Sequence, residues 1–249
     1  MSKLMWSPWH GCHKCSPGCL NCYVYYLDKM RDKDASIITK SKTNFNLPLK
    51  KTRNGSYKIP SGATIPTCFT SDFFLPEADA WRNDAWEIIK KRNDVTFLIC
   101  TKRISRFNLC IPIDWGEGYP NVIIAVTCET KEKAYERLPI LLNIKAHKKY
   151  IFASPLLEEI DFSEFLKTGE IDLISVGGES YENARLCDFA WVQKIYYDAL
   201  KYHVNFDFHQ TGSNFKMGNK IYKIKHFEEY NQARKAMDYL RKTNKNDLK

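Results

Sequence analysis

The sequence predicts an α/β protein in which parallel strands form a partial (βα)6–7 barrel. Short β-branched or apolar runs recur along the chain, and their starts lie about 23 to 31 residues apart, which is the spacing of βα units. A length of 249 residues and a hydrophobic content of 44% are enough for one large core. The predicted strands are residues 65–70, 95–101, 122–127, 150–154, 173–176 and 204–208.

Amphipathic helices are predicted between these strands, because apolar residues recur there near helical spacing. Near-continuous apolar strands that alternate with such helices are typical of a parallel sheet covered on its outer face. Ahead of them, a short strand near residues 3–9 leads into a cysteine-rich loop, and that loop opens a helix. The predicted helices are residues 21–31, 79–92, 131–142 and 189–202.

The net charge of +9 is unevenly distributed. Residues 35–71 carry six Lys and Arg and no acid, and residues 216–249 carry ten Lys and Arg against four acids. We therefore assign the barrel to residues 1–215, with a basic insertion at about 35–62, and a basic extension to residues 216–249. A solvated surface or a disordered tail accounts for such runs without a function. The functional interpretation is a phosphate-rich partner, with nucleic acid as the leading candidate.

Four cysteines lie within eleven residues near the N-terminus, at Cys12, Cys15, Cys19 and Cys22. Read from Cys15, their spacing is C-x3-C-x2-C, which places three thiolates around a cubane iron–sulfur cluster and leaves a fourth iron open to a substrate. Four thiolates could instead close a tetrahedral structural zinc site. Such zinc sites usually draw two ligand pairs from separate knuckles, whereas one loop holds all four cysteines here, which favours the cluster.

The cysteine usage also indicates a reducing compartment. Nine cysteines is an odd number, and residues 1–9 contain no apolar run typical of a secretory signal. We therefore expect reduced thiols and a cytoplasmic location. No apolar run reaches about 18 residues, which predicts that the chain does not span a membrane.

The carboxyl ends of the predicted strands carry small or chemically capable side chains. In a barrel those ends converge at one mouth, where such folds place their chemistry. The segments at these ends are Thr70-Ser71-Asp72, Thr101-Lys102-Arg103, Thr127-Cys128-Glu129, Ser154-Pro155, Gly177-Gly178-Glu179-Ser180 and His209-Gln210-Thr211-Gly212.

Several of these blocks, together with the cysteine loop, resemble a known family in their order and spacing. A cysteine loop that opens a helix after a short first strand is similar to that of the radical S-adenosylmethionine (SAM) enzymes. More closely, the chain resembles an uncharacterised phage- and prophage-borne family of radical-SAM-like proteins. The blocks are Trp9-His10-Gly11-Cys12, Ser16-Pro17-Gly18-Cys19-Leu20-Asn21-Cys22-Tyr23, Thr101-Lys102-Arg103, Pro155-Leu156-Leu157, Gly177-Gly178-Glu179-Ser180 and His209-Gln210-Thr211-Gly212.

The resemblance implies a [4Fe-4S] cluster, SAM as cofactor, and an electron donor such as flavodoxin or ferredoxin. In that family the first cysteine directly follows the glycine, as Cys12 does, which implies the ligands Cys12, Cys19 and Cys22. Spacing alone prefers Cys15 as the third ligand, and both alternatives stay open. Asn21 stands where an aromatic residue commonly precedes the last cysteine, so stacking on adenine from that position is not expected.

The implied reaction is reductive cleavage of SAM, followed by hydrogen abstraction from an unidentified substrate, for which nucleic acid and nucleotides are candidates. Lys102 or Arg103 would pair with the methionine carboxylate, and Arg offers the better two-point geometry. Asp72 is the candidate for the amino group. Glu129 or Glu179 is the candidate for the ribose.

Gly177, Gly178 and Glu179 repeat the letters of a motif that binds the methionine amino group in radical SAM enzymes. That motif usually follows the second strand, whereas here it follows the sixth. The functional interpretation is that the glycines let the backbone approach a ligand while Glu179 binds its hydroxyls or ammonium. A tight strand-to-helix turn is the structural alternative. His209 lies at the same predicted mouth.

Two functions from other classes remain. A zinc-stabilised nucleic-acid-binding protein without catalysis explains the cysteines and the basic segments, but leaves the polar strand ends unused. A metal-independent barrel enzyme with His209 as acid or base would keep its activity without the loop cysteines.

Overall fold

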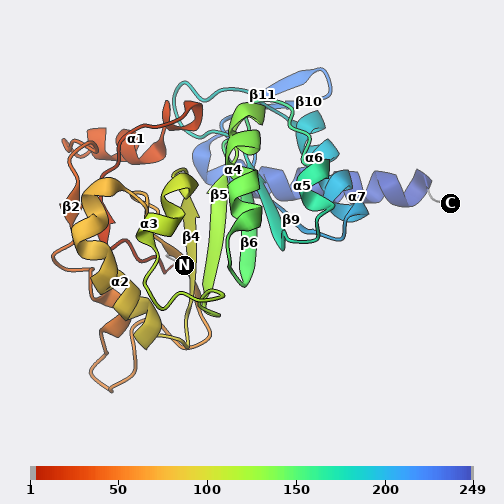
Figure 1. The fold of residues 1–249 in the computed structure, drawn as a ribbon. Helices are drawn as coiled ribbons and strands as arrows, with labels where there is room; N and C mark the ends of the chain where they lie inside the picture. The colour runs from red at the N-terminus through yellow and green to blue at the C-terminus, as the bar shows by residue number, and fades with distance from the viewer. Residues whose placement is uncertain (1–3, 248–249) are drawn as a thin grey trace. The chain divides into compact units, whose positions relative to one another are not determined.

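A computed structural model describes residues 4–247 of the chain, and Figure 1 shows their helices and strands. The first and last residues of the two predicted domains, 1–3 and 248–249, lie outside the described residues. Six strands form the main sheet: β3 (Thr64–Thr67), β4 (Thr96–Thr101), β5 (Val122–Thr127), β6 (Lys148–Ala153), β7 (Leu173–Gly177) and β9 (Asn205–Gln210).

The order of these strands in the sheet is β3-β4-β5-β6-β7-β9, and the pairings with a defined register are parallel. Sequence order and sheet order therefore agree, and the order does not return to its first strand. An α/β fold with an open parallel sheet is confirmed, which is consistent with a partial barrel. The six predicted strands agree with those observed to within three residues at each end.

The largest difference concerns β3, which ends three residues before the predicted strand 65–70 does. Cys68 has a φ of 63°, a left-handed conformation that an extended strand does not contain. The amide of Ser71 then donates to the Cys68 carbonyl at 3.1 Å, which closes a turn. The chain therefore leaves the sheet at Cys68 and reaches Asp72 through this turn.

The chain divides into two compact units, which are described separately below. Unit 1 comprises Met1–Cys15, Val24–Val126 and Ile140–Lys149. Unit 2 comprises Ser16–Tyr23, Thr127–Pro139 and Tyr150–Lys249.

In unit 1, the predicted first strand is only partly regular. Trp6 forms a single parallel bridge with Thr67 of β3, and β1 (Trp9–His10) pairs instead with β2 (Thr39–Lys40) in an antiparallel ribbon. Gly11 follows β1 with a φ of +90°, and a Cβ there would lie 2.3 Å from the Ile37 carbonyl oxygen. Only glycine fits this position, which directs the chain into the cysteine loop.

The helices of unit 1 are α1 (Tyr23–Lys29), α2 (Asp79–Lys91) and the short α3 (Phe107–Cys110). Helix α2 buries the apolar face that its spacing predicted, which includes Ala85, Trp86 and Ile89. The ring centroid of Trp86 lies 5.0 Å from that of Phe73 and 5.3 Å from that of Trp115. Its indole nitrogen donates to the Cys110 carbonyl at 2.7 Å. These aromatic residues are part of the core of unit 1.

In unit 2, the predicted helices 131–142 and 189–202 correspond to α4 (Lys131–Asn143), most of which lies in this unit, and α6 (Phe189–Lys201). A second sheet, which the sequence analysis did not predict, has the order β11-β10-β8. The other elements of unit 2 are the 3-10 helices η1 (Pro17–Cys19) and η5 (His226–Glu228), α5 (Ser163–Leu166), β8 (Cys187–Asp188), β10 (Asn214–Met217), β11 (Lys220–Lys223) and α7 (Glu229–Asp247).

Most of the predicted basic extension is folded. Its strands β10 and β11 form an antiparallel hairpin, and β10 also pairs with β8. Helix α7 buries Ala233, Ala236, Met237 and Leu240, which recur at helical spacing on one face. The basic residues of this region therefore surround a helix, α7, that packs through its apolar face. No helix in the part of the chain that the structure describes is long and apolar enough to cross a membrane.

Candidate functional site

The cysteine loop passes from unit 1 to unit 2, so its cysteines are described in two pairs. Cys12 and Cys15 belong to unit 1, where Cys12 is half-buried and Cys15 is exposed. Cys19 and Cys22 belong to unit 2, where Cys19 is buried in η1 and Cys22 is half-buried.

Cys68, Cys110 and Cys187, which lie outside the loop, are buried. Burial raises the pKa of the Cys68 and Cys110 thiols, and it raises that of Cys187 to about 12. A thiol must lose its proton to bind a metal ion. These three buried thiols are therefore poor metal ligands.

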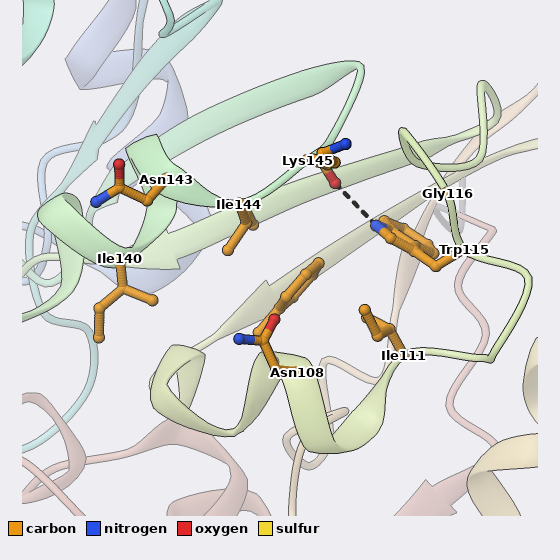
Figure 2. Close-up of a pocket in the computed structure, with 9 residues that line it drawn as sticks. Asn108, Ile111, Trp115, Gly116, Ile140, Asn143, Ile144 and Lys145 are labelled. Atoms are coloured by element: carbon orange, nitrogen blue, oxygen red, sulfur yellow. Dashed lines mark hydrogen bonds between the residues drawn. The ribbon is translucent and has the colours of Figure 1, made fainter.

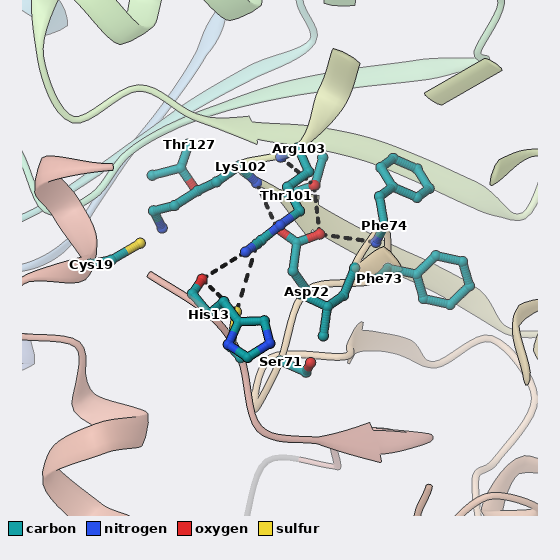
Figure 3. A network of polar contacts seen from close by, with 12 residues as sticks. His13, Cys19, Ser71, Asp72, Phe73, Phe74, Thr101, Lys102, Arg103 and Thr127 are labelled. Atoms are coloured by element: carbon teal, nitrogen blue, oxygen red, sulfur yellow. Dashed lines mark hydrogen bonds and ion pairs between the residues drawn. The ribbon is translucent and has the colours of Figure 1, made fainter. Parts of the chain in front are cut away.

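In unit 1, Asp72 accepts hydrogen bonds at the ends of β3 and β4 (Figure 3). Its side chain is 6% exposed. One carboxylate oxygen accepts from the Phe74 amide at 2.9 Å and the Thr101 hydroxyl at 2.7 Å. The other accepts from the Lys102 amide at 2.9 Å and the Arg103 guanidinium at 3.2 Å. The structure thus joins three of the predicted cofactor-binding residues, Asp72, Lys102 and Arg103, in one network.

Arg103 connects this network to the cysteine loop. Its Nη1 atom, which contacts Asp72, also lies 3.7 Å from the Cys12 sulfur, and its Nη2 atom donates to the His13 carbonyl at 2.6 Å. Burial alone would lower the pKa of Arg103, but the charges of Asp72 and of the Cys12 and Cys15 thiolates raise it above its ordinary value. The guanidinium therefore stays charged, and its charge favours the thiolate form of Cys12.

The backbone of Cys12 is held as well. Its amide donates to the Ala35 carbonyl at 2.8 Å, and its carbonyl accepts from the Tyr25 hydroxyl. The next residue, His13, contacts Glu77 through its Nε2 atom at 2.7 Å. Cys12 is thus placed by several contacts within unit 1.

In unit 2, Glu179 binds the other end of the cysteine loop. Its carboxylate accepts from the side-chain amide of Asn21 at 2.8 Å and from the Arg185 backbone amide at 2.9 Å. The Arg185 guanidinium forms two further bonds to it, at 2.5 and 3.0 Å, and donates to the Pro17 carbonyl at 3.0 Å. Burial alone would raise the pKa of Glu179, but the bonds from Arg185 and Asn21 lower it below its ordinary value.

Glu129 is fully buried in unit 2 and contacts the same loop at Gly18. One of its carboxylate oxygens accepts from the Gly18 amide at 3.3 Å, and the other accepts from Arg137 at 2.9 Å. A Cβ on Gly18 would lie 3.0 Å from the Glu129 side chain. Arg137 also donates to the Thr127 carbonyl, while its buried Nε atom has no partner. Glu129 thus packs beneath the loop.

Gly177, the last residue of β7, and Gly178, which follows it, allow close packing rather than an unusual backbone conformation. A Cβ on Gly177 would lie 2.5 Å from His209 Nε2 and 2.8 Å from Ser154 Oγ. On Gly178 it would lie 2.1 Å from the Thr211 carbonyl oxygen. Both positions therefore exclude any side chain.

His209 lies beside Gly177 and between two hydroxyl groups. Its Nδ1 atom is 2.9 Å from Ser175 Oγ, and its Nε2 atom is 3.3 Å from Ser154 Oγ. Ser175 in turn donates to Asp207 at 3.2 Å. Since a hydroxyl carries one proton, this bond leaves Ser175 to accept from Nδ1, so that Nε2 can accept from Ser154. This arrangement is suited to moving a proton.

The sequence analysis did not identify three residues that bind these carboxylates. They are Arg137, Arg185 and Asn21, whose side-chain amide donates to Glu179. Arg185 lies in the turn after Glu179, where no periodic pattern marks it, and Asn21 was considered only as a substitute for an aromatic residue. Arg137 lies on α4, eight residues after Glu129, a spacing close to two helical turns that could have suggested a contact.

A pocket of unit 1 lies elsewhere (Figure 2). It has a volume of about 370 Å³ and lies between α3 and the residues that end α4. None of the predicted site residues lines it. It is bordered by Phe107, Asn108, Ile111, Trp115, Gly116, Ile140, Asn143, Ile144 and Lys145.

The chemistry of the loop's donor set fits an iron–sulfur cluster, because four thiols share one loop and a guanidinium contacts one of them. Among residues 4–247, no three His, Cys, Asp or Glu side chains are already gathered as a metal site.

Fold and site together define an α/β protein with an open parallel sheet and a thiol-rich loop whose two ends are bound by ion-paired arginines. The chain belongs to the DUF5131 family, described as a protein of unknown function, whose model matches residues 2–245. No curated protein and no solved structure matches the chain.

Proposed function

We propose that this protein is an iron–sulfur enzyme that cleaves SAM reductively and starts radical chemistry on a substrate still to be identified. The observation that carries the proposal is the contact of Arg103 with the Cys12 sulfur. A guanidinium that is 12% exposed, held by Asp72 and in contact with a thiol, favours the thiolate, which is the form that binds iron. A cytoplasmic location belongs to the same proposal, since the thiols must stay reduced.

Cys12, Cys19 and Cys22 would hold a [4Fe-4S] cluster, with Cys15 as the alternative to Cys12. When bound, the cluster would supply the electron that breaks a sulfur–carbon bond of SAM. The chain's own part is to place the thiols. Glu129 and Glu179 hold the loop at Gly18 and Asn21, and Arg103 holds it at His13.

These contacts change the roles expected of Asp72, Glu129 and Glu179. Asp72 and Glu179 each accept four hydrogen bonds from the protein, and Glu129 is fully buried. A carboxylate bound in this way must break existing bonds before it can bind an amino group or a ribose. We therefore assign these acids first to holding the loop and its neighbouring arginine. Lys102 remains the candidate for the methionine carboxylate.

The test is anaerobic reconstitution with iron and sulfide, followed by incubation with SAM and dithionite. We expect bound iron and sulfide, and formation of 5′-deoxyadenosine or methylthioadenosine, whose identity would also show which sulfur–carbon bond breaks. Tight zinc binding by all four thiols, with no SAM cleavage, would support the zinc-stabilised binding protein instead. SAM cleavage that survives loss of the loop cysteines would contradict both.

A further inference from the structure

The basic insertion of unit 1 contains a short antiparallel hairpin, residues 50–58, which we call the basic hairpin. Lys51 pairs with Tyr57 across it. The amide of Thr52 donates to the Ser56 carbonyl, and the amide of Lys58 donates to the Lys50 carbonyl, both at 2.8 Å. The tip turns at Gly55, which has a φ of +84°. The segment between β2 and β3 is therefore partly a folded ribbon (Figure 1, orange).

The base of the basic hairpin is anchored by Arg92, whose side chain is 1% exposed. Its guanidinium donates to the Pro48 carbonyl on one side of the hairpin and to the Ile59 carbonyl on the other, the latter at 2.8 Å. It also lies 4.0 Å from the ring centroid of Tyr57. One buried cation thus holds both ends of the ribbon together and presents the rest to solvent.

The basic hairpin carries four cations: Lys50, Lys51, Arg53 and Lys58. All of residues 35–71 lack acids. Of the six cations in that segment, Lys40 is paired with a carboxylate, Asp84, at 3.2 Å, and in the described part of the chain no carboxylate pairs with the other five. A fixed ribbon of uncompensated positive charge is complementary to a row of phosphates.

The two aromatic residues of the insertion do not form a stacking platform. Phe45 is 7% exposed, and the Lys40 ammonium lies 4.2 Å from its ring centroid. Tyr57 is 40% exposed, but both Arg92 and Lys51 already contact its ring. Single-strand binding relies on several aromatic rings on which successive bases stack. One ring that two cations already contact is a poor platform of this kind, and the structure therefore favours a paired nucleic acid over a single strand.

We propose that the basic hairpin binds double-stranded DNA through its phosphates, with the ribbon lying in or along the major groove. The major groove of B-DNA admits a two-stranded β-ribbon, whereas that of an RNA duplex is deep and narrow. This goes beyond the proposed enzymatic function and does not depend on it, because the hairpin contains no cysteine and its anchor lies within unit 1.

The test measures binding of the full-length protein to a DNA duplex of about 20 base pairs, by fluorescence anisotropy at several salt concentrations. The variant is Lys51→Ala/Arg53→Ala/Lys58→Ala. Each phosphate contact contributes about 0.9 to the slope of log K against log salt, so three lost contacts should flatten it by about 2.7. Between 50 and 200 mM salt, wild type should therefore lose about 40-fold more affinity than the variant does.

A matched control removes the same charge elsewhere: Lys91→Ala/Lys148→Ala/Lys167→Ala, at three exposed positions. It should keep nearly the wild-type slope. As a second variant, Arg53→Glu at the hairpin tip should weaken duplex binding, and circular dichroism establishes that each variant is folded. Iron content after reconstitution, measured on the same samples, should not change, which separates this proposal from the cluster.

Four results would overturn the proposal: equal slopes in wild type and the hairpin variant, equal flattening in the control, tighter binding to a single strand of the same sequence, or hairpin-dependent binding to anionic lipid vesicles without duplex binding.

Discussion

Replacing Glu179 with alanine should release residues 17–21 of the cysteine loop from the rest of unit 2. The substitution removes the acceptor of four hydrogen bonds, from Asn21 and from three donors of Arg185. Arg185 then keeps its bond to the Pro17 carbonyl but loses the carboxylate that orients it. Asn21, one residue before Cys22, loses the bond to Glu179 as well.

The size of the effect follows from burial. The Glu179 side chain is 4% exposed, whereas that of Arg185 is 31% exposed. Removing one partner of a fully buried ion pair costs about 3–5 kcal/mol. Because Arg185 can regain part of its hydration, we expect Glu179→Ala to lower the free energy of unfolding of the loop by about 2–3 kcal/mol.

Hydrogen exchange of the loop amides measures this directly in the metal-free protein. The amides of Cys19 and Leu20 donate to Ser16 and Pro17 at 2.9 and 3.2 Å, so their exchange reports opening of η1. An opening free energy lowered by 2–3 kcal/mol should speed their exchange about 30- to 140-fold. Cluster content after reconstitution should fall in parallel, since the loop must be in place to bind iron.

The control is Glu117→Ala, which breaks an exposed ion pair with Lys145 in which the side chains are 73% and 63% exposed. Such a change should alter stability by less than about 0.5 kcal/mol and leave the loop amides unaffected. Exchange in Glu179→Ala that matches the control would refute the role of Glu179 in holding the loop. Normal loop exchange combined with weakened SAM binding would return Glu179 to its expected role as a ligand of the cofactor.

Three further predictions concern the same regions. Cys19→Ala and Cys22→Ala should abolish iron binding. Cys12→Ala should remove most of the bound iron, whereas Cys15→Ala should retain it. If iron analysis instead shows that Cys15→Ala loses the iron and Cys12→Ala retains it, Cys15 is the third ligand. Gly178→Val should lower the free energy of unfolding in urea by about 1–3 kcal/mol, because the new Cβ would lie 2.1 Å from the Thr211 carbonyl oxygen. An unchanged midpoint of urea unfolding would contradict this. Since the pKa of Glu179 is below the ordinary value of 4.5, its contribution to stability is present above pH 4.5 and is lost as the pH falls through the folded pKa. Glu179→Gln should therefore show a flatter acid dependence of stability below that pH than wild type does.

The main secondary structure was predictable because it is encoded locally. The runs 122–127 and 173–176 match β5 and β7 within one residue, since a buried parallel strand needs apolar side chains on both faces. The apolar spacing of α2 and α6 identified them in the same way. Where a local exception interrupts the pattern, as at Cys68 after β3, the prediction extended too far.

The C-terminal region was harder to interpret from the sequence. Its charge suggested a basic extension, but Ala233, Ala236, Met237 and Leu240 lie buried on one face of α7. Alanine contributes little to a hydrophobic pattern, so the apolar face was hidden among charged residues. The strands β8, β10 and β11 were missed because they are four residues long or shorter, and because β8 pairs with β10, which lies far from it in the sequence.

By itself, the sequence determined the order of strands and helices, the four clustered thiols and the acid-free basic segment. Each of these is a property of neighbouring residues. Only the tertiary structure decided which partners the acids meet. Glu129 contacts Gly18 across 111 positions and Glu179 contacts Asn21 across 158, and no local periodicity encodes such distances. The physical reason is that a buried carboxylate must be paired, and the fold, which brings distant segments together, determines the donors that pair with it.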